Sequence, residues 1–132
     1  MAVWKILLAD DDPEDREIIR DAMAVYNAEA FIHFAENGEQ ALDILERNLA
    51  LQGVPCLVVL DLNMPRMNGL ETLKQIKQHK KLNEVPVIIY STSINPLERE
   101  KCLRLGALEF FTKPVSFQES KEIAKKLLSY CS

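Results

Sequence analysis

The chain has few of the residues that mark several classes of protein. Its 132 residues include only 4 glycines, 3 cysteines and 1 tryptophan. No apolar run approaches the roughly 20 residues that span a bilayer, so we expect no membrane partner. Met1 to Lys5 precede a short apolar run and then acids, which is not the layout of a signal peptide. The sequence therefore predicts a cytoplasmic protein.

Charge of neither sign dominates. Sixteen Lys and Arg residues stand against 20 Asp and Glu residues, for a net charge of −4. The basic residues are scattered among acids, whereas a nucleic-acid surface gathers them on one face. We expect no direct binding of nucleic acid.

The cysteines are Cys56, Cys102 and Cys131. Their number is odd and their spacing matches no metal site. The sequence predicts free thiols in a reducing compartment.

What the chain does contain is an alternation of apolar runs with amphipathic segments. The runs are Trp4–Ala9, Phe31–Phe34, Cys56–Leu60, Val85–Tyr90 and Leu108–Phe111. The third and fourth runs are apolar on both faces of a strand, which is typical of a parallel sheet covered by helices on both sides.

The segments between the runs have helical spacing. The first starts at Pro13 with Asp12 as its expected cap, and its apolar stripe comprises Ile18, Ile19, Ala22, Met23 and Tyr26. The second segment carries Ala41 to Leu49, and the third carries Leu70 to Ile76. The fourth follows Asn95-Pro96, and the fifth starts near Ser116. Asn48–Pro55 resembles a loose surface loop. Five such units predict a three-layer, doubly wound α/β sandwich with right-handed crossovers.

Polar side chains follow four of the runs directly. They are Asp10, Asp11 and Asp12, then Asp61, then Ser91, Thr92 and Ser93, and finally Thr112, Lys113 and Pro114. Ligands of such sheets bind at the carboxyl ends of the strands, so we expect these residues to meet at one edge.

Each residue also has an ordinary structural interpretation. Asp12 before Pro13 is a helix cap, and Asp10 and Asp11 could be solvated loop acids. Asp61 could end a turn, and Lys113 could be a surface charge. Ser91 and Thr92 could satisfy turn backbone. Four strand ends with compatible chemistry favour a shared site over four separate coincidences.

The chemistry of the cluster indicates phosphoryl transfer. Two carboxylates about 4 Å apart repel by roughly 4 kcal/mol at an effective dielectric near 20, so the cluster needs a cation. A site with only a few carboxylate ligands and room for bound water suits Mg²⁺. Lys113 adds a charge for a phosphate oxygen, and Asp61 is then a carboxylate nucleophile.

These residues resemble the receiver domain of two-component response regulators. The resemblance rests on Ala9 to Asp12, on the stretch Leu60 to Gly69, on Tyr90-Ser91-Thr92 and on Thr112-Lys113-Pro114. It covers nearly the whole chain. It implies a single receiver domain over 1–132 without an output domain, with a five-stranded parallel sheet in the flavodoxin-like order 2-1-3-4-5.

The resemblance also implies a role for each residue. Asp61 would accept the phosphoryl group, with Asp10, Asp11, Asp61 and the carbonyl of Asn63 around Mg²⁺ or Mn²⁺. Ser91, Thr92 and Lys113 would bind the phosphoryl group. Ser91 and Phe110 would form the switch, although Phe110 could also be a plain core residue. The Lys113–Pro114 peptide bond would be cis.

The sequence is compatible with three functions. The first is a phosphorylation-controlled switch, a monomer or weak dimer, that takes its phosphoryl group from a sensor histidine kinase or phosphotransfer protein and signals to an unknown downstream protein. The second is a phosphatase that turns over through Asp61, although Asn63 stands where such enzymes usually carry an acid. The third is a receiver that binds partners without phosphorylation.

Overall fold

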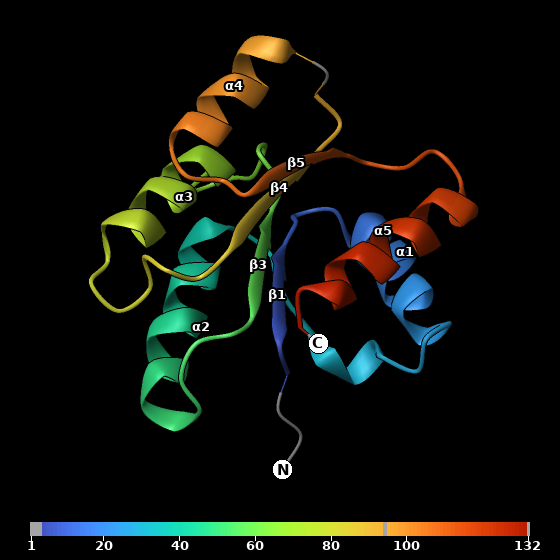
Figure 1. Cartoon of the computed structure of the whole chain (residues 1–132), viewed down its shortest axis with the longest axis horizontal. Coiled ribbons are helices and arrows are strands. Elements are labelled where there is room, and N and C mark those ends of the chain that lie inside the picture. The colour runs from blue at the N-terminus through green and yellow to red at the C-terminus, as the bar shows by residue number, and fades with distance from the viewer. Residues whose placement is uncertain (1–3, 94, 132) are drawn as a thin grey trace.

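A computed structural model describes residues 4–93 and 95–131, which form one parallel sheet with helices on both faces (Figure 1). The strand order is β2-β1-β3-β4-β5. The strands are β1 (Ile6–Ala9), β2 (Ile32–Ala35), β3 (Leu57–Leu60), β4 (Val87–Ser91) and β5 (Glu109–Thr112). The predicted three-layer, flavodoxin-like fold and its strand order are confirmed.

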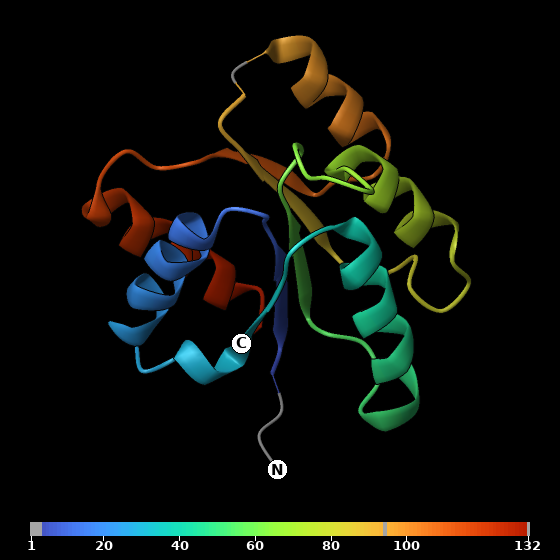
Figure 2. The ribbon, with the colours of Figure 1, turned by 180° about the vertical axis from the view of Figure 1, so that it is seen from behind.

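The helices divide into two layers, which Figures 1 and 2 show on opposite sides of the sheet. The first layer holds α2 (Gly38–Leu51), α3 (Gly69–Gln78) and α4 (Pro96–Arg104), and the second holds α1 (Pro13–Ala24) and α5 (Phe117–Ser129). A short 3₁₀ turn, Glu29–Phe31, precedes β2. Within the described residues, no helix is both long enough and apolar enough to cross a membrane.

The apolar strands account for the layering. Every residue of β1 and β3 is buried. Side chains alternate across a strand, so Leu7 joins the core under α2 and α3 while Ile6 joins the core under α1 and α5. The edge strand β2 is less covered, because His33 is exposed there.

Side-chain caps fix where the helices begin. The Asp12 carboxylate accepts the N–H of Glu14 at 2.9 Å at the start of α1, as the sequence predicts. Asn68 and Glu71 form a reciprocal capping box at the start of α3. Each cap sits just after a loop at the carboxyl edge of the sheet, so the caps also set the course of those loops.

Two expectations about helix boundaries and faces were wrong. The predicted loop Asn48–Pro55 begins too early, because α2 continues to Leu51 and the Asn48 carbonyl accepts the N–H groups of Gln52 and Gly53. Gly53 has φ +86°, which favours glycine after a helix end. In α1, Ile18 is 40% exposed; Tyr26, also expected in the buried stripe, lies beyond the helix and is 39% exposed.

The prediction of three free thiols was also wrong. Cys56, just before β3, is bonded to Cys131, just after α5, with a Cα–Cα distance of 5.5 Å. Cys102 is free and buried. The two bonded residues are 75 positions apart in sequence, so their proximity depends on α5 folding back across the sheet. In a reducing compartment the same pair would be two thiols.

The disulfide predicts a specific thiol count. Under denaturing, non-reducing conditions one thiol should titrate, that of Cys102, and after reduction three should titrate. Closing a loop of this length stabilises a protein by about 4 kcal/mol, so reduction should lower the melting temperature. Cys131→Ser, the control, should melt at the same temperature with and without reductant. Three thiols in untreated protein would contradict the pairing.

Candidate functional site

The candidate site lies at the carboxyl edge of the sheet, where four strands end. Asp10 follows β1, Asp61 follows β3, Ser91 ends β4 and Lys113 follows β5. Backbone hydrogen bonds continue past the strand ends. The N–H of Asp61 donates to Ala9 O at 3.0 Å, and that of Lys113 donates to Ser91 O at 2.8 Å. The backbone of the site is therefore held by the same ladder as the sheet.

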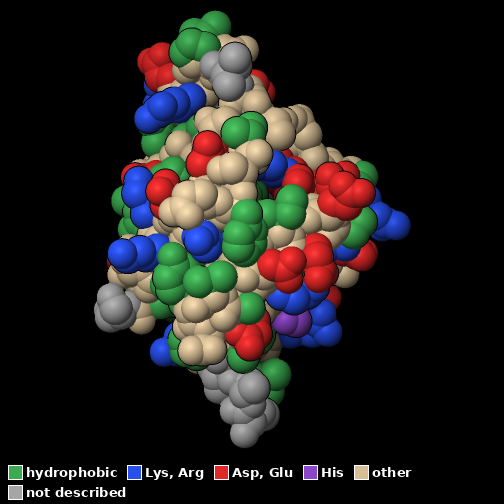
Figure 3. All heavy atoms as spheres, turned by 90° about the vertical axis from the view of Figure 1, so that its right-hand side faces the viewer, with side chains coloured by type: hydrophobic (Ala, Val, Ile, Leu, Met, Phe, Trp, Pro, Cys, Tyr) green, Lys and Arg blue, Asp and Glu red, His purple; other side chains and the backbone are tan. Residues whose placement is uncertain are grey.

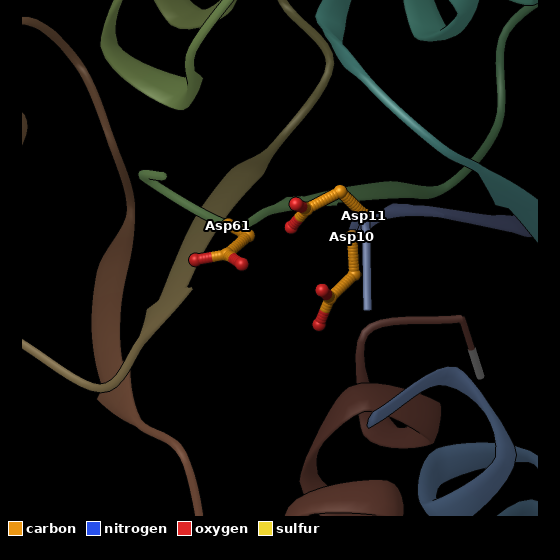
Figure 4. A group of neighbouring side chains, drawn as sticks. All are labelled: Asp10, Asp11 and Asp61. Atoms are coloured by element: carbon orange, nitrogen blue, oxygen red, sulfur yellow. The ribbon is translucent and has the colours of Figure 1, made fainter. Parts of the chain in front are cut away.

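Three carboxylates meet at this edge. Oxygens of Asp10, Asp11 and Asp61 all lie within 4.8 Å of one another. Figure 4 shows the three side chains converging on a shared space from two neighbouring strand ends. Asp10 is fully buried and Asp61 is 5% exposed, whereas Asp11 is exposed. The cluster therefore has one side open to solvent.

Lys113 carries the positive charge of the site. Its Nζ lies 2.8 Å from Asp10 Oδ2, 2.7 Å from Asp15 Oδ2 and 3.0 Å from Asp61 Oδ2. The Lys113 side chain is 8% exposed, so these ion pairs are largely shielded from solvent. An ammonium group has three N–H donors, and here three carboxylates surround it.

The pKa values of the site reflect burial and pairing together. Burial raises the pKa of Asp10 to about 6; Lys113 acts in the opposite direction, and the charge of Asp61 adds to the rise. For Lys113, burial alone would lower the pKa, but hydrogen bonds to Asp10, Asp15 and Asp61 outweigh it and raise the pKa. Lys113 therefore stays charged, and Asp10 is harder to ionise than an ordinary carboxyl group.

The donor set fits a hard divalent cation. Oxygen ligands with an exposed side suit Mg²⁺ or Mn²⁺, which keep several waters when bound. Asp10, Asp11 and Asp61 provide the carboxylates within 4.8 Å of each other. Asn63 lies in the loop after Asp61, and its N–H donates to Asp61 Oδ1 at 3.4 Å.

The loop after Asp61 returns closely to the strand end. The N–H of Gly69 donates to Leu62 O at 3.0 Å. A Cβ atom at Gly69 would lie 2.2 Å from the carbonyl oxygen of Asp61, which real Cβ atoms do not approach. Only glycine fits there, so the Asp61-to-Gly69 stretch owes its course partly to the missing side chain.

The remaining predicted residues lie around the acid cluster in different environments. Ser91 is fully buried, and its Oγ accepts the N–H of Ser93 at 3.2 Å. Thr92 is exposed. Phe110 is 9% exposed and packs in the core under α2, α3 and α4, whereas Phe111 faces α5. The structure thus brings Asp10, Asp11, Asp61 and Lys113 together, whereas Phe110 lies in the apolar core, outside the acid cluster.

One expectation from the resemblance is contradicted. The Lys113–Pro114 peptide bond is trans, since no described peptide bond is cis. The trans form of a bond before proline is favoured by about 0.5–1 kcal/mol unless the surroundings select the cis form. The Lys113 side chain reaches all three carboxylates with the trans bond in place.

Two residues of the site were missed from the sequence. Asp15 is an acid in the first turn of α1, which suits the helix dipole, yet it also contacts Lys113. The other is Tyr90, because Lys113 Nζ lies over the Tyr90 ring, 5.6 Å from the ring centroid. The signal for Asp15 was its place in the first turn of α1, because side chains there lean toward the helix start and hence toward the site.

The comparisons agree with this geometry. The family model of the response regulator receiver domain matches residues 6–125. The chain therefore belongs to the receiver domain family of two-component signalling. A chemotaxis protein CheY homologue of Campylobacter jejuni is 31% identical over 94% of this chain and 92% of its own. Two longer relatives are covered over only 53% and 34% of their lengths.

Solved structures agree as well. The phosphorylated cyanobacterial phytochrome response regulator RcpA has a TM-score of 0.85 and 29% identity, covering 98% of this chain and 94% of its own. The bacteriophytochrome response regulator AtBRR has a TM-score of 0.75 and 30% identity, covering 95% of this chain and 91% of its own.

The acid cluster predicts that a divalent cation stabilises the fold. Millimolar Mg²⁺ should raise the melting temperature, because it relieves carboxylate repulsion and binds only the folded state. Asp11→Asn should reduce the shift. Asp12→Asn is the matched control, because Asn caps a helix as well as Asp does. A melting temperature that is insensitive to Mg²⁺ would count against the clustered geometry.

The raised pKa of Asp10 predicts a pH-dependent stability difference. With a folded pKa of about 6 against an ordinary 3.8, ionisation of Asp10 lowers the stability of the fold progressively as pH rises from 3.8 to about 6. In metal-free buffer Asp10→Asn should therefore be more stable than the wild type at pH 7.5, by up to about 3 kcal/mol. The advantage should shrink as pH falls from 6 toward 4. Denaturant unfolding at both ends of this range measures it; an advantage that grows at low pH would refute the assignment.

Proposed function

We propose that the chain is a phosphorylation-controlled switch in which Asp61 accepts the phosphoryl group. The observation that carries the proposal is the meeting of Asp61, two further carboxylates and the Lys113 ammonium at one strand edge. The solved relative RcpA, a phosphorylated response regulator, supports the same chemistry.

The chemistry follows from the charges. A carboxylate oxygen of Asp61 attacks phosphorus, the bond from phosphorus to the donor breaks, and the leaving group departs with the electron pair. If the donor is a phosphohistidine, the leaving group is imidazole, which takes a proton from solvent. Lys113 binds a phosphoryl oxygen, and Ser91 and Thr92 supply hydroxyl donors. Mg²⁺ or Mn²⁺ held by Asp10, Asp11, Asp61 and the Asn63 carbonyl would neutralise charge on the phosphoryl group.

Two successive hydrogen bonds connect Ser91 to α4 and support a switch that runs from the site to this helix. Ser91 Oγ accepts the N–H of Ser93, and Ser93 Oγ in turn donates to Glu98 in the first turn of α4. Rotation of the Ser91 hydroxyl toward a phosphoryl group would break the first of these hydrogen bonds. Phe110 is buried beside α4, so its ring would repack when α4 shifts. The proposed output surface is formed by α4, β5 and α5.

The surface next to the site supports docking of a phosphodonor protein. Ile18 and Phe117 are 40% and 48% exposed, and Val115 is 91% exposed. Ile18, Val115 and Phe117 line a shallow hollow together with Pro114, Ser116 and Ser120. Figure 3 shows hydrophobic side chains among charged ones on the face that carries α1 and α5. We assign this surface to a histidine kinase or phosphotransfer protein. RcpA and AtBRR are response regulators of a phytochrome and a bacteriophytochrome, so a phytochrome is the first donor to test.

The remaining parts of the proposal concern the whole chain. We propose a receiver domain that is a monomer or weak dimer in the cytoplasm and signals to a downstream protein. It is not a turnover enzyme. Asn63 offers an amide where a phosphatase of the aspartyl-phosphate type would need an acid to protonate its leaving group.

Phosphorylation can be tested with small donors. Incubation with Mg²⁺ and acetyl phosphate should add one phosphoryl group, and peptide mapping after borohydride reduction should place it on Asp61. Asp61→Asn should not react. Asp21→Asn, which removes an exposed acid of α1, should react as the wild type does.

Two outcomes would overturn the proposal. A phosphoryl group on a residue other than Asp61 would remove the assigned acceptor. Multiple turnover of a small phosphate ester, lost in Asp61→Asn, would instead indicate an enzyme.

A further inference from the structure

The Asp15–Lys113 ion pair is not explained by the roles proposed above. Asp15 is the third residue of α1, whereas Lys113 lies in the loop after β5. The 2.7 Å between Asp15 Oδ2 and Lys113 Nζ is the shortest of the three carboxylate contacts of the ammonium. Asp15 therefore connects α1 to the phosphoryl-binding side chain.

The three carboxylates around Lys113 differ in what else they do. Asp10 and Asp61 both belong to the acid cluster that fits a cation, and Asp61 is the proposed acceptor. Asp15 is outside that cluster. When Asp61 carries a phosphoryl group and Asp10 turns to a cation, two partners of the ammonium are lost, while Asp15 remains available.

An ordinary surface ion pair would have little effect, because solvent screens it. This pair is different. The side chain of Lys113 is 8% exposed and that of Asp15 is 28% exposed. Lys113 has four rotatable bonds in its stem, and fixing its ammonium group beside Asp61 requires partners that hold it there.

We propose that Asp15 is a positioning residue that holds the Lys113 ammonium at the α1 side of the site, where it meets a phosphoryl oxygen on Asp61. The inference rests on the proposed function of Asp61 and Lys113. In the unphosphorylated protein Asp15 shares the ammonium with Asp10 and Asp61. In the phosphorylated protein it keeps one N–H while a phosphoryl oxygen takes another.

The sign of a charge effect separates positioning from simple electrostatics. Removing a negative charge near the site by itself strengthens the binding of an anion. Loss of positioning weakens it. Glu14→Gln removes the same charge from the same helical turn, and the Glu14 side chain is exposed. It is therefore a matched control for Asp15→Asn.

The test is the binding of beryllofluoride, a phosphoryl mimic, at saturating Mg²⁺. Asp15→Asn should weaken binding by about tenfold, the effect of replacing the charged acceptor of the Lys113 ammonium with a neutral one. Asp15→Glu should recover part of the loss, and Glu14→Gln should bind as tightly as the wild type or slightly tighter. Mg²⁺ affinity is measured separately for each variant, so that loss of the cation is not mistaken for loss of the anion.

A second readout follows the ammonium itself. In the beryllofluoride complex at low temperature, the ¹H–¹⁵N signal of the Lys113 ammonium should be visible for the wild type and Glu14→Gln, and broadened or shifted for Asp15→Asn. Unchanged affinity and an unchanged ammonium signal in Asp15→Asn would overturn the inference. So would tighter binding by Asp15→Asn. If wild-type protein binds no beryllofluoride, the proposed function fails first, which is a distinguishable result.

Discussion

The candidate site depends on one buried ammonium group among carboxylates. Asp10, Asp15 and Asp61 each lie within 3.0 Å of Lys113 Nζ. Oxygens of Asp10 and Asp61 lie within 4.8 Å of each other, and two carboxylates about 4 Å apart repel by roughly 4 kcal/mol at an effective dielectric near 20. Lys113 offsets that repulsion and links the ends of β1, β3 and β5 with the start of α1. The same contacts give the protein a site that a cation and a phosphoryl group would rearrange.

The sheet explains why these groups meet. Parallel strands place their carboxyl ends at one edge, and the buried ladder from β2 to β5 fixes their order. The helices on each face leave that edge as the place where polar side chains gather. Because Gly69 has no side chain, the loop that follows Asp61 can pass close to the carbonyl oxygen of Asp61. The fold and the site therefore share the same constraints.

Much of this architecture could be predicted from the sequence. Runs that are apolar on both strand faces require helices on both sides, and Asp61 follows such a run directly. The link between Cys56 and Cys131 could not be predicted, because it depends on where α5 ends in space. Asp15 has two local interpretations, since an acid in the first turn also suits the helix dipole. Only the contact with Lys113 distinguishes them.

The most direct measurement is a crystal structure with Mg²⁺ and beryllofluoride bound. The account predicts beryllium on a carboxylate oxygen of Asp61, a Lys113 ammonium that contacts both a fluoride and Asp15, and Mg²⁺ among Asp10, Asp11 and the Asn63 carbonyl. An adduct elsewhere, or a Lys113 ammonium turned away from the beryllofluoride, would contradict it.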